Sequence, residues 1–94
     1  MEQSKFVFEC LVIKEGIGFT ALCLDVDVAS EGSTIAEAKE NVREAVTLYI
    51  ESAIENNLPI IRPVPAKEIP QITRPGDVVE AFTIGVNVQV TAHV

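Results

Sequence analysis

The sequence predicts an α+β fold in which an antiparallel meander of strands carries one helix on one face. Three observations predict it. Aromatic and β-branched residues fill short runs before residue 33, apolar residues recur at helical spacing over residues 35–55, and residues 82–92 alternate between apolar and polar. The expected order is strand, strand, strand, helix, strand, with the last strand paired beside the first.

The first two strands form a predicted hairpin. Residues 6–13 are rich in aromatic and β-branched side chains, and residues 19–24 form a second apolar run. Gly16 and Gly18 lie between them and suit a tight turn, because glycine readily takes positive φ. A bend and a short third strand are expected over residues 25–31.

A helix is expected to follow over residues 35–55. Thr34 and Glu37 have the spacing of a capping box, in which two side chains satisfy free backbone N–H groups at the start of a helix. One face of this helix is apolar and the other is acidic. Asn41 lies at the edge of the apolar stripe, and we expect its amide to bond to a neighbouring loop or strand end.

Proline separates the helix from the last strand. All five prolines lie between residues 59 and 75, which predicts a stiff, extended connection and excludes a central strand there. A chain of 94 residues supports one domain with one modest core. Within that single domain, 1–94, we expect a unit of three strands and a helix in 1–56, the proline-rich connection in 57–80 and the final strand in 81–93.

A hairpin that pairs residue 14 with residue 19 leaves both faces of the sheet apolar. One face then collects Phe6, Phe8, Cys10, Val12, Phe19, Ala21 and Cys23, and the other Val7, Leu11, Ile13, Leu22 and Leu24. One helix covers only one face. We expect the second face to be an interface, in a dimer or larger homo-oligomer or with a partner protein. The alternative is that the proline-rich segment folds back as its cover.

The same register makes Cys10 and Cys23 cross-strand neighbours. Two cysteines are too few for a disulfide scaffold or a four-ligand zinc site. We expect both to pack in the core as free thiols, with a disulfide between them as the alternative. His93, the one histidine, has no predicted nucleophile or orienting partner and is expected to lie at a frayed terminus.

The charge is acidic and unevenly placed. The chain has 14 acidic and 7 basic residues, and its net charge of −7 falls wholly in residues 1–56. Nucleic acid is held mainly by Lys and Arg, so the balance disfavours nucleic-acid binding and favours a basic partner. No run approaches the ~20 apolar residues of a membrane span, and the N-terminus lacks the plan of a signal peptide. We expect a cytoplasmic protein without a cofactor.

Asp25 and Asp27 are spaced to lie on one side of a strand, where paired carboxylates could bind a metal or share a proton. No histidine or third carboxylate lies nearby in the sequence, so we predict neither metal ligands nor catalytic residues. These two acids and Glu31, near the strand-to-helix corner, are candidates for contact with a basic partner. The acidic face of the helix is an equal candidate, with Glu40, Glu44 and Glu51.

Residues 19–46 resemble the HicB-like antitoxin family of toxin–antitoxin systems. The shared features are an aromatic-x-Ala entry to the second strand, Ser30-x-Gly32-x-Thr34, Glu37-Ala38, Asn41 and Glu44-Ala45. The resemblance implies a truncated ribonuclease H-like βββαβ fold. It also implies a non-catalytic protein that binds and neutralises a small basic HicA-like toxin, which cleaves messenger RNA.

Two departures from the family pattern qualify this resemblance. Leu24 and Asp27 stand where many members have proline at the bend, and a C-terminal DNA-binding domain has no counterpart before Val94. Operator binding is therefore not expected. One alternative function is a stand-alone oligomeric regulatory or ligand-binding domain. The other is a metal-dependent nuclease using Glu9, Asp25 and Asp27, which is disfavoured because the last strand carries no acid.

Overall fold

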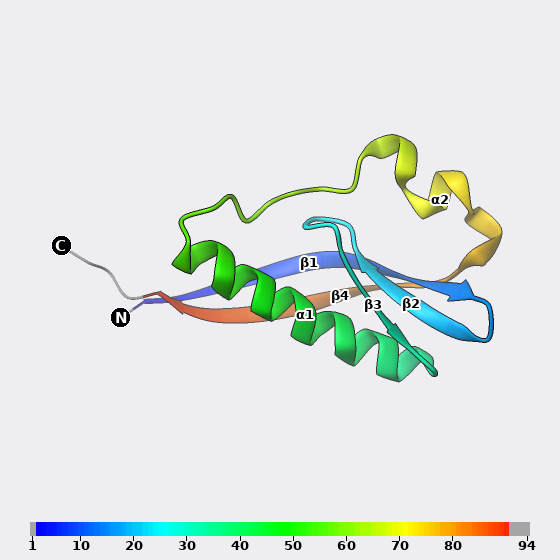
Figure 1. The fold of residues 1–94 in the computed structure, drawn as a ribbon, viewed down its shortest axis with the longest axis horizontal. Coiled ribbons are helices and arrows are strands. Elements are labelled where there is room, and N and C mark those ends of the chain that lie inside the picture. The colour runs from blue at the N-terminus through cyan, green and yellow to red at the C-terminus, as the bar shows by residue number, and fades with distance from the viewer. Residues whose placement is uncertain (1, 91–94) are drawn as a thin grey trace.

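The computed structural model describes residues 2–90 as one sheet with a long helix across it (Figure 1). The long helix is α1 (Ile35–Glu55). The strands are β1 (Glu2–Glu15), β2 (Gly18–Cys23), β3 (Val28–Gly32) and β4 (Val78–Val90). Three short helices lie between α1 and β4, namely η1 (Ala66–Glu68), α2 (Pro70–Thr73) and η2 (Pro75–Asp77).

The sheet has the strand order β3-β2-β1-β4, and each neighbouring pair is antiparallel. The predicted α+β class, the meander and the position of the last strand beside the first are confirmed. β4 begins at Val78, a few residues before the predicted start. β1 and β4 pair over most of their length and form a long two-stranded ribbon, while β2 and β3 widen the sheet at the hairpin end.

The register of the first hairpin agrees with the one expected from the glycine turn. Lys14 pairs with Phe19, and Cys10 pairs with Cys23. Gly16 has φ +58°, so the turn uses the left-handed conformation that glycine adopts without a Cβ penalty. The register fixes which side chains face α1, because alternate residues of a strand lie on opposite faces.

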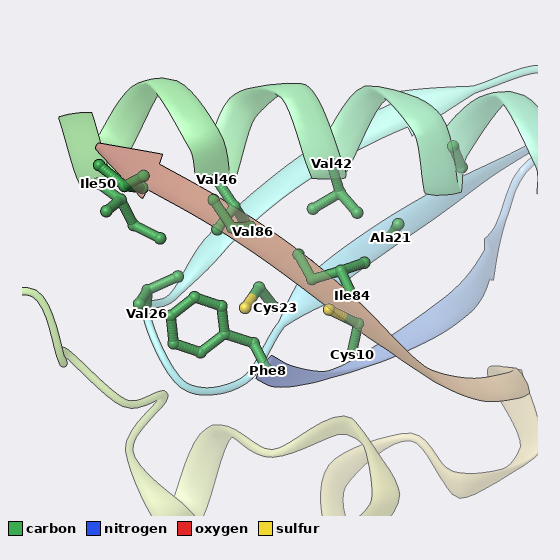
Figure 2. Close-up of a cluster of buried hydrophobic side chains, with 12 residues drawn as sticks. Phe8, Cys10, Ala21, Cys23, Val26, Val42, Val46, Ile50, Ile84 and Val86 are labelled. Carbon is green, nitrogen blue, oxygen red and sulfur yellow. The ribbon is translucent and has the colours of Figure 1, made fainter. Parts of the chain in front are cut away.

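The core lies between the sheet and α1 (Figure 2). Val42, Val46 and Ile50 recur at helical spacing and are fully buried against the sheet. Phe8 and Val86, from the paired strands β1 and β4, are also buried there. The outer face of α1 is polar, and no helix within residues 2–90 has both the length and the apolar character needed to cross a membrane.

The proline-rich segment covers the hairpin half of the second face, so the expectation of an exposed interface there was wrong; Val7, further along the same face, is 63% exposed. Leu11 and Ile13 are only 2% and 3% exposed, and Val64 and Pro70 are buried with them. Val64 N–H donates to the carbonyl of Leu24 at 2.9 Å, which ties the segment to the end of β2. The alternative that the segment folds back as a cover is the one the structure supports.

The connection is extended only in part. Residues 61–65 are extended, but η1, α2 and η2 follow, with Pro70 and Pro75 as the first residues of α2 and η2. A proline in the first turn costs no hydrogen bond, because a backbone N–H at that position would have no acceptor within the helix. The prolines therefore start short helices here as well as stiffen the chain. In Figure 1 the segment runs back along the sheet from the end of α1 toward the β1–β2 hairpin.

Candidate functional site

The corner between β3 and α1 is held by side-chain caps. Thr34 Oγ1 accepts a hydrogen bond from the backbone N–H of Glu37 at 3.0 Å. The Glu37 carboxylate in turn accepts from the backbone N–H of Ser33 at 3.0 Å. The predicted capping box is thus present, with its carboxylate bonded one residue before the N-cap. It orients Glu37 toward the end of β3.

Gly32 and Asn41 complete the same corner. A Cβ atom on Gly32 would lie 2.4 Å from the backbone nitrogen of Ala38, so the first turn of α1 packs directly on the glycine. Asn41 Nδ2 donates to the carbonyl of Glu31 at 2.8 Å, as expected from its position at the edge of the stripe. The motif residues behind the family resemblance therefore serve the strand-to-helix junction. They present Glu31 and Glu37 beside each other.

An acidic groove of about 400 Å³ opens at this corner. We call it the corner groove; its lining residues are Glu15, Gly18, Phe19, Thr20, Glu31, Gly32 and Glu37. Its three carboxylates come from β1, β3 and α1, and no Lys or Arg is among these lining residues. The strand register explains the convergence, since Glu15 pairs with Gly18 and Thr20 pairs with Glu31. Such a groove is suited to cationic side chains.

A second groove, of about 270 Å³, lies between the sheet and the proline-rich segment. Asp27, Glu15 and Glu68 line it together with Arg74. Arg74 bonds to Asp77 at 3.2 Å and to Glu15 at 3.4 Å. The pKa of the Arg74 guanidinium is raised, chiefly by its hydrogen bond to Asp77. Arg74 thus offsets part of the acidic charge on this side of the hairpin.

Asp25 and Asp27 do not form a joint site. Asp25 Oδ2 accepts from the backbone N–H of Glu9 at 2.8 Å, and its carbonyl accepts from Arg62 N–H at 3.0 Å. Asp25 therefore ties the bend to β1 and to the proline-rich segment. Asp27 is exposed and has φ +51°. Residues 2–90 contain no group of three or more His, Cys, Asp or Glu placed to hold a metal, and His93 lies outside the described residues.

The three candidate acids of α1 lie on its exposed face. Glu40 forms an ion pair with Arg43, whose hydrogen bond lowers the pKa of the carboxyl. Glu44 lines a shallow depression with Leu48, which is 66% exposed. Glu51 is also exposed one turn further on. This face is separate from the corner groove, so the six predicted contact residues do not converge on one place.

Sequence reasoning did not propose Glu15, Glu37 or Glu68 as contact residues. The sequence predicts Glu37 as a capping residue, and in the structure it both caps α1 and lines the corner groove. Glu15 could have been found from the hairpin register, which brings it next to the strand that pairs with Glu31. Glu68 could not have been found in this way, because its place depends on how the proline-rich segment folds back.

Cys10 and Cys23 are cross-strand neighbours as predicted, and both are free thiols in the core (Figure 2). They are 1% and 0% exposed. The pKa of Cys10 is raised well above its usual range, because its S–H hydrogen-bonds to Cys23 and because burial penalises a thiolate. Buried thiols of this kind are inert packing groups rather than nucleophiles.

A solved structure shares the fold of this chain. Neither a protein-family model nor a curated protein matches the sequence. One chain of a solved structure described as "HicA3 and HicB3 toxin-antitoxin complex" matches with a TM-score of 0.57 and 21% sequence identity. The match covers 86% of this chain and 95% of that chain. The protein therefore shares the fold of a component of a toxin–antitoxin complex.

Proposed function

We propose that this chain is a non-catalytic, cytoplasmic, antitoxin-like protein that binds and neutralises a small basic HicA-like toxin. The observation that carries the proposal is the corner groove, in which Glu15, Glu31 and Glu37 converge from three elements. The fold shared with a chain of a toxin–antitoxin complex supports the same class of partner. The resemblance of residues 19–46 to HicB-like antitoxins supports the antitoxin side of such a pair.

The acidic charge suits this partner for a physical reason. A toxin that cleaves messenger RNA must hold phosphate, so its active surface carries Lys or Arg. Carboxylates in a groove attract the same side chains, and a protein bound there competes with RNA for them. With a net charge of −7, the whole chain also steers a basic partner toward itself.

The proposed contact residues fall into two sets. Glu31 with Glu15 and Glu37 forms the first set, and Asp27 extends it on the far side of the hairpin. The second set is on α1, where Glu44 and the exposed Leu48 line a depression together with Arg43, the partner of Glu40. Glu51 is exposed on the same helix. Asp25 accepts a hydrogen bond within the fold and lines neither groove, so its proposed part is to position the bend.

A nuclease is the less favoured reading of the same residues. Glu9, Asp25 and Asp27 were the candidate ligands, and the carboxylate of Asp25 accepts from the backbone N–H of Glu9. A carboxylate engaged in the fold in this way is poorly placed to share a metal with its neighbours. We therefore propose that the chain acts by occupying the toxin's surface, without chemistry of its own.

Co-expression with a small basic HicA-like toxin encoded next to this gene tests the proposal. We expect the toxin to copurify with the chain and growth to be rescued. Glu31→Lys should abolish rescue, whereas Glu55→Lys, an equal charge reversal of an exposed acid outside both sets, should leave it intact. If the wild-type chain neither copurifies nor rescues growth, the stand-alone oligomeric regulatory domain becomes the better account.

A further inference from the structure

β4 is one of the two edge strands, and its outer edge has no partner within residues 2–90. β4 stands at the end of the strand order β3-β2-β1-β4. Among the backbone hydrogen bonds made by turns and connecting segments in the described residues, only that from Val78 N–H to the carbonyl of Pro75 involves β4, at its first residue. About half of its N–H and C=O groups point away from β1. Such a row is a template for another strand.

From Ala81 onward the edge of β4 lacks the devices that keep edge strands apart, whereas a register shift at Val79 and the charge of Glu80 lie in its first three residues. The strand is 13 residues long and contains no proline. Residues 81–94 are the longest stretch of the sequence without Asp, Glu, Lys or Arg. On the face opposite α1, the exposed residues Thr83, Gly85 and Asn87 are uncharged. Natural proteins usually protect a long edge with charges, prolines or bulges.

The other edge of the sheet is different. β3 has only five residues and carries the exposed Glu31 beside the corner groove. Two copies meeting at β3 would bring like charges together, which is unfavourable. The charge distribution therefore separates the two edges. The β3 edge suits a basic partner, and the β4 edge offers such a partner no acid within residues 81–92.

We propose that β4 pairs with β4 of a second copy, antiparallel, around a two-fold axis perpendicular to the sheet. The hydrogen-bond row of an antiparallel strand is complementary to itself, as a two-fold interface requires. Two chains of net charge −7 repel each other, and this uncharged edge is where they meet at least cost. The product is a continuous eight-stranded sheet with both copies of α1 on one face.

The regular, uncharged part of the edge is long. Its ten residues, 81–90, at ~3.4 Å per residue give an edge of about 34 Å. Phe82 is half-buried and Val79 is 47% exposed, so side chains next to the new strand gain cover. The dimer also leaves the corner grooves free, since they lie by β3 at the two outer ends. On the proposed toxin-binding function, each dimer therefore takes two toxins.

Light scattering of the purified full chain tests the pairing without any toxin. We expect the mass to rise from that of the 10.2 kDa chain at low micromolar concentration to twice that mass at millimolar concentration. Thr83→Lys with Asn87→Lys should give a folded monomer, because four lysines then face one another across the axis. Ile17→Lys is the matched control: Ile17 is fully exposed in the β1–β2 turn, and its lysine should leave the dimer intact. A wild type that stays monomeric, or a dimer that survives the double change, overturns the proposal.

Hydrogen exchange of the wild-type chain keeps the test decisive if the double variant does not fold. Peptides covering residues 81–90 should exchange at least tenfold more slowly at high than at low chain concentration. Peptides covering β3 should be unaffected. A dimer with no concentration-dependent protection in β4 would use another surface and would overturn the proposal. Because toxin is absent from both experiments, their failure leaves the proposed function untouched.

Discussion

Gly32 lies against Ala38 so closely that a Cβ on the glycine would come within 2.4 Å of the alanine backbone nitrogen. The contact joins the last residue of β3 to the first turn of α1, and it involves backbone that cannot move aside. It fixes the distance between Glu31 and Glu37, two of the three acids in the corner groove. The acidic site therefore depends on a residue without a side chain.

Gly32→Ala should destabilise the fold by about 1–3 kcal/mol, because the added methyl group overpacks the junction. Chemical denaturation monitored by circular dichroism measures the loss. Gly76→Ala is the control, since a Cβ there meets nothing within 4 Å and its φ is not positive. That variant should be as stable as the wild type or slightly more so. Equal stability of the two variants would contradict the close packing.

Thr34→Ala should cost about 1 kcal/mol, because the N–H of Glu37 loses its acceptor at the start of α1. Thr34→Ser retains the hydroxyl and should recover most of the loss. Thermal unfolding of the three proteins provides the comparison. A serine variant as unstable as the alanine variant would mean that the threonine methyl group, and not the cap, is what matters.

Asp25→Ala should lower the free energy of unfolding by about 1–2 kcal/mol, because the N–H of Glu9 is left without its acceptor. Asp25→Asn keeps an acceptor oxygen and should lose less. If Asp25 positions the bend and does not touch the toxin, the asparagine variant should bind toxin as the wild type does. A strong loss of binding in a stable Asp25→Asn protein would place this carboxylate in the interface.

Stability should fall as pH rises above about 8.5, the ordinary pKa of a thiol. The pKa of Cys10 is raised in the native protein by its hydrogen bond with Cys23 and by burial. Above pH 8.5 the unfolded chain has lost a proton that native Cys10 keeps, so rising pH stabilises the unfolded state relative to the native state. Denaturation midpoints at several pH values, compared with Cys10→Ala, isolate this effect. An unchanged slope in the variant would show that other groups cause it.

Local pattern predicted the corner well. The Thr34–Glu37 spacing, the place of Asn41 and the glycine turn that sets Cys10 opposite Cys23 depend on neighbours in the chain or on one hairpin register. The interactions at this corner join residues that are close in the sequence, so capping motifs and turn residues predict them. The succession of strands and the long helix along the chain could be predicted for the same reason, whereas the pairing of β4 with β1 is a long-range contact, from Val90 back to Glu2.

The cover of the second face could not be predicted. It depends on Val64 bonding to Leu24, 40 positions earlier, and on Pro70 being buried while other prolines stay exposed. Nothing in local sequence separates a folded-back segment from an extended one. The convergence of Glu15 and Glu31 could be predicted only in part. It follows from the strand pairing once the registers of β1, β2 and β3 are all known.

The central claim is that the corner groove binds a basic toxin, and the most direct measurement is calorimetric titration of this chain with an inactive variant of that toxin. The wild-type chain should bind the toxin more weakly as the salt concentration rises. Glu31→Lys should weaken binding at least about tenfold, equivalent to about 1.4 kcal/mol, and flatten the salt dependence. Glu55→Lys should do neither. Binding that is equally tight in both variants and independent of salt would contradict the account.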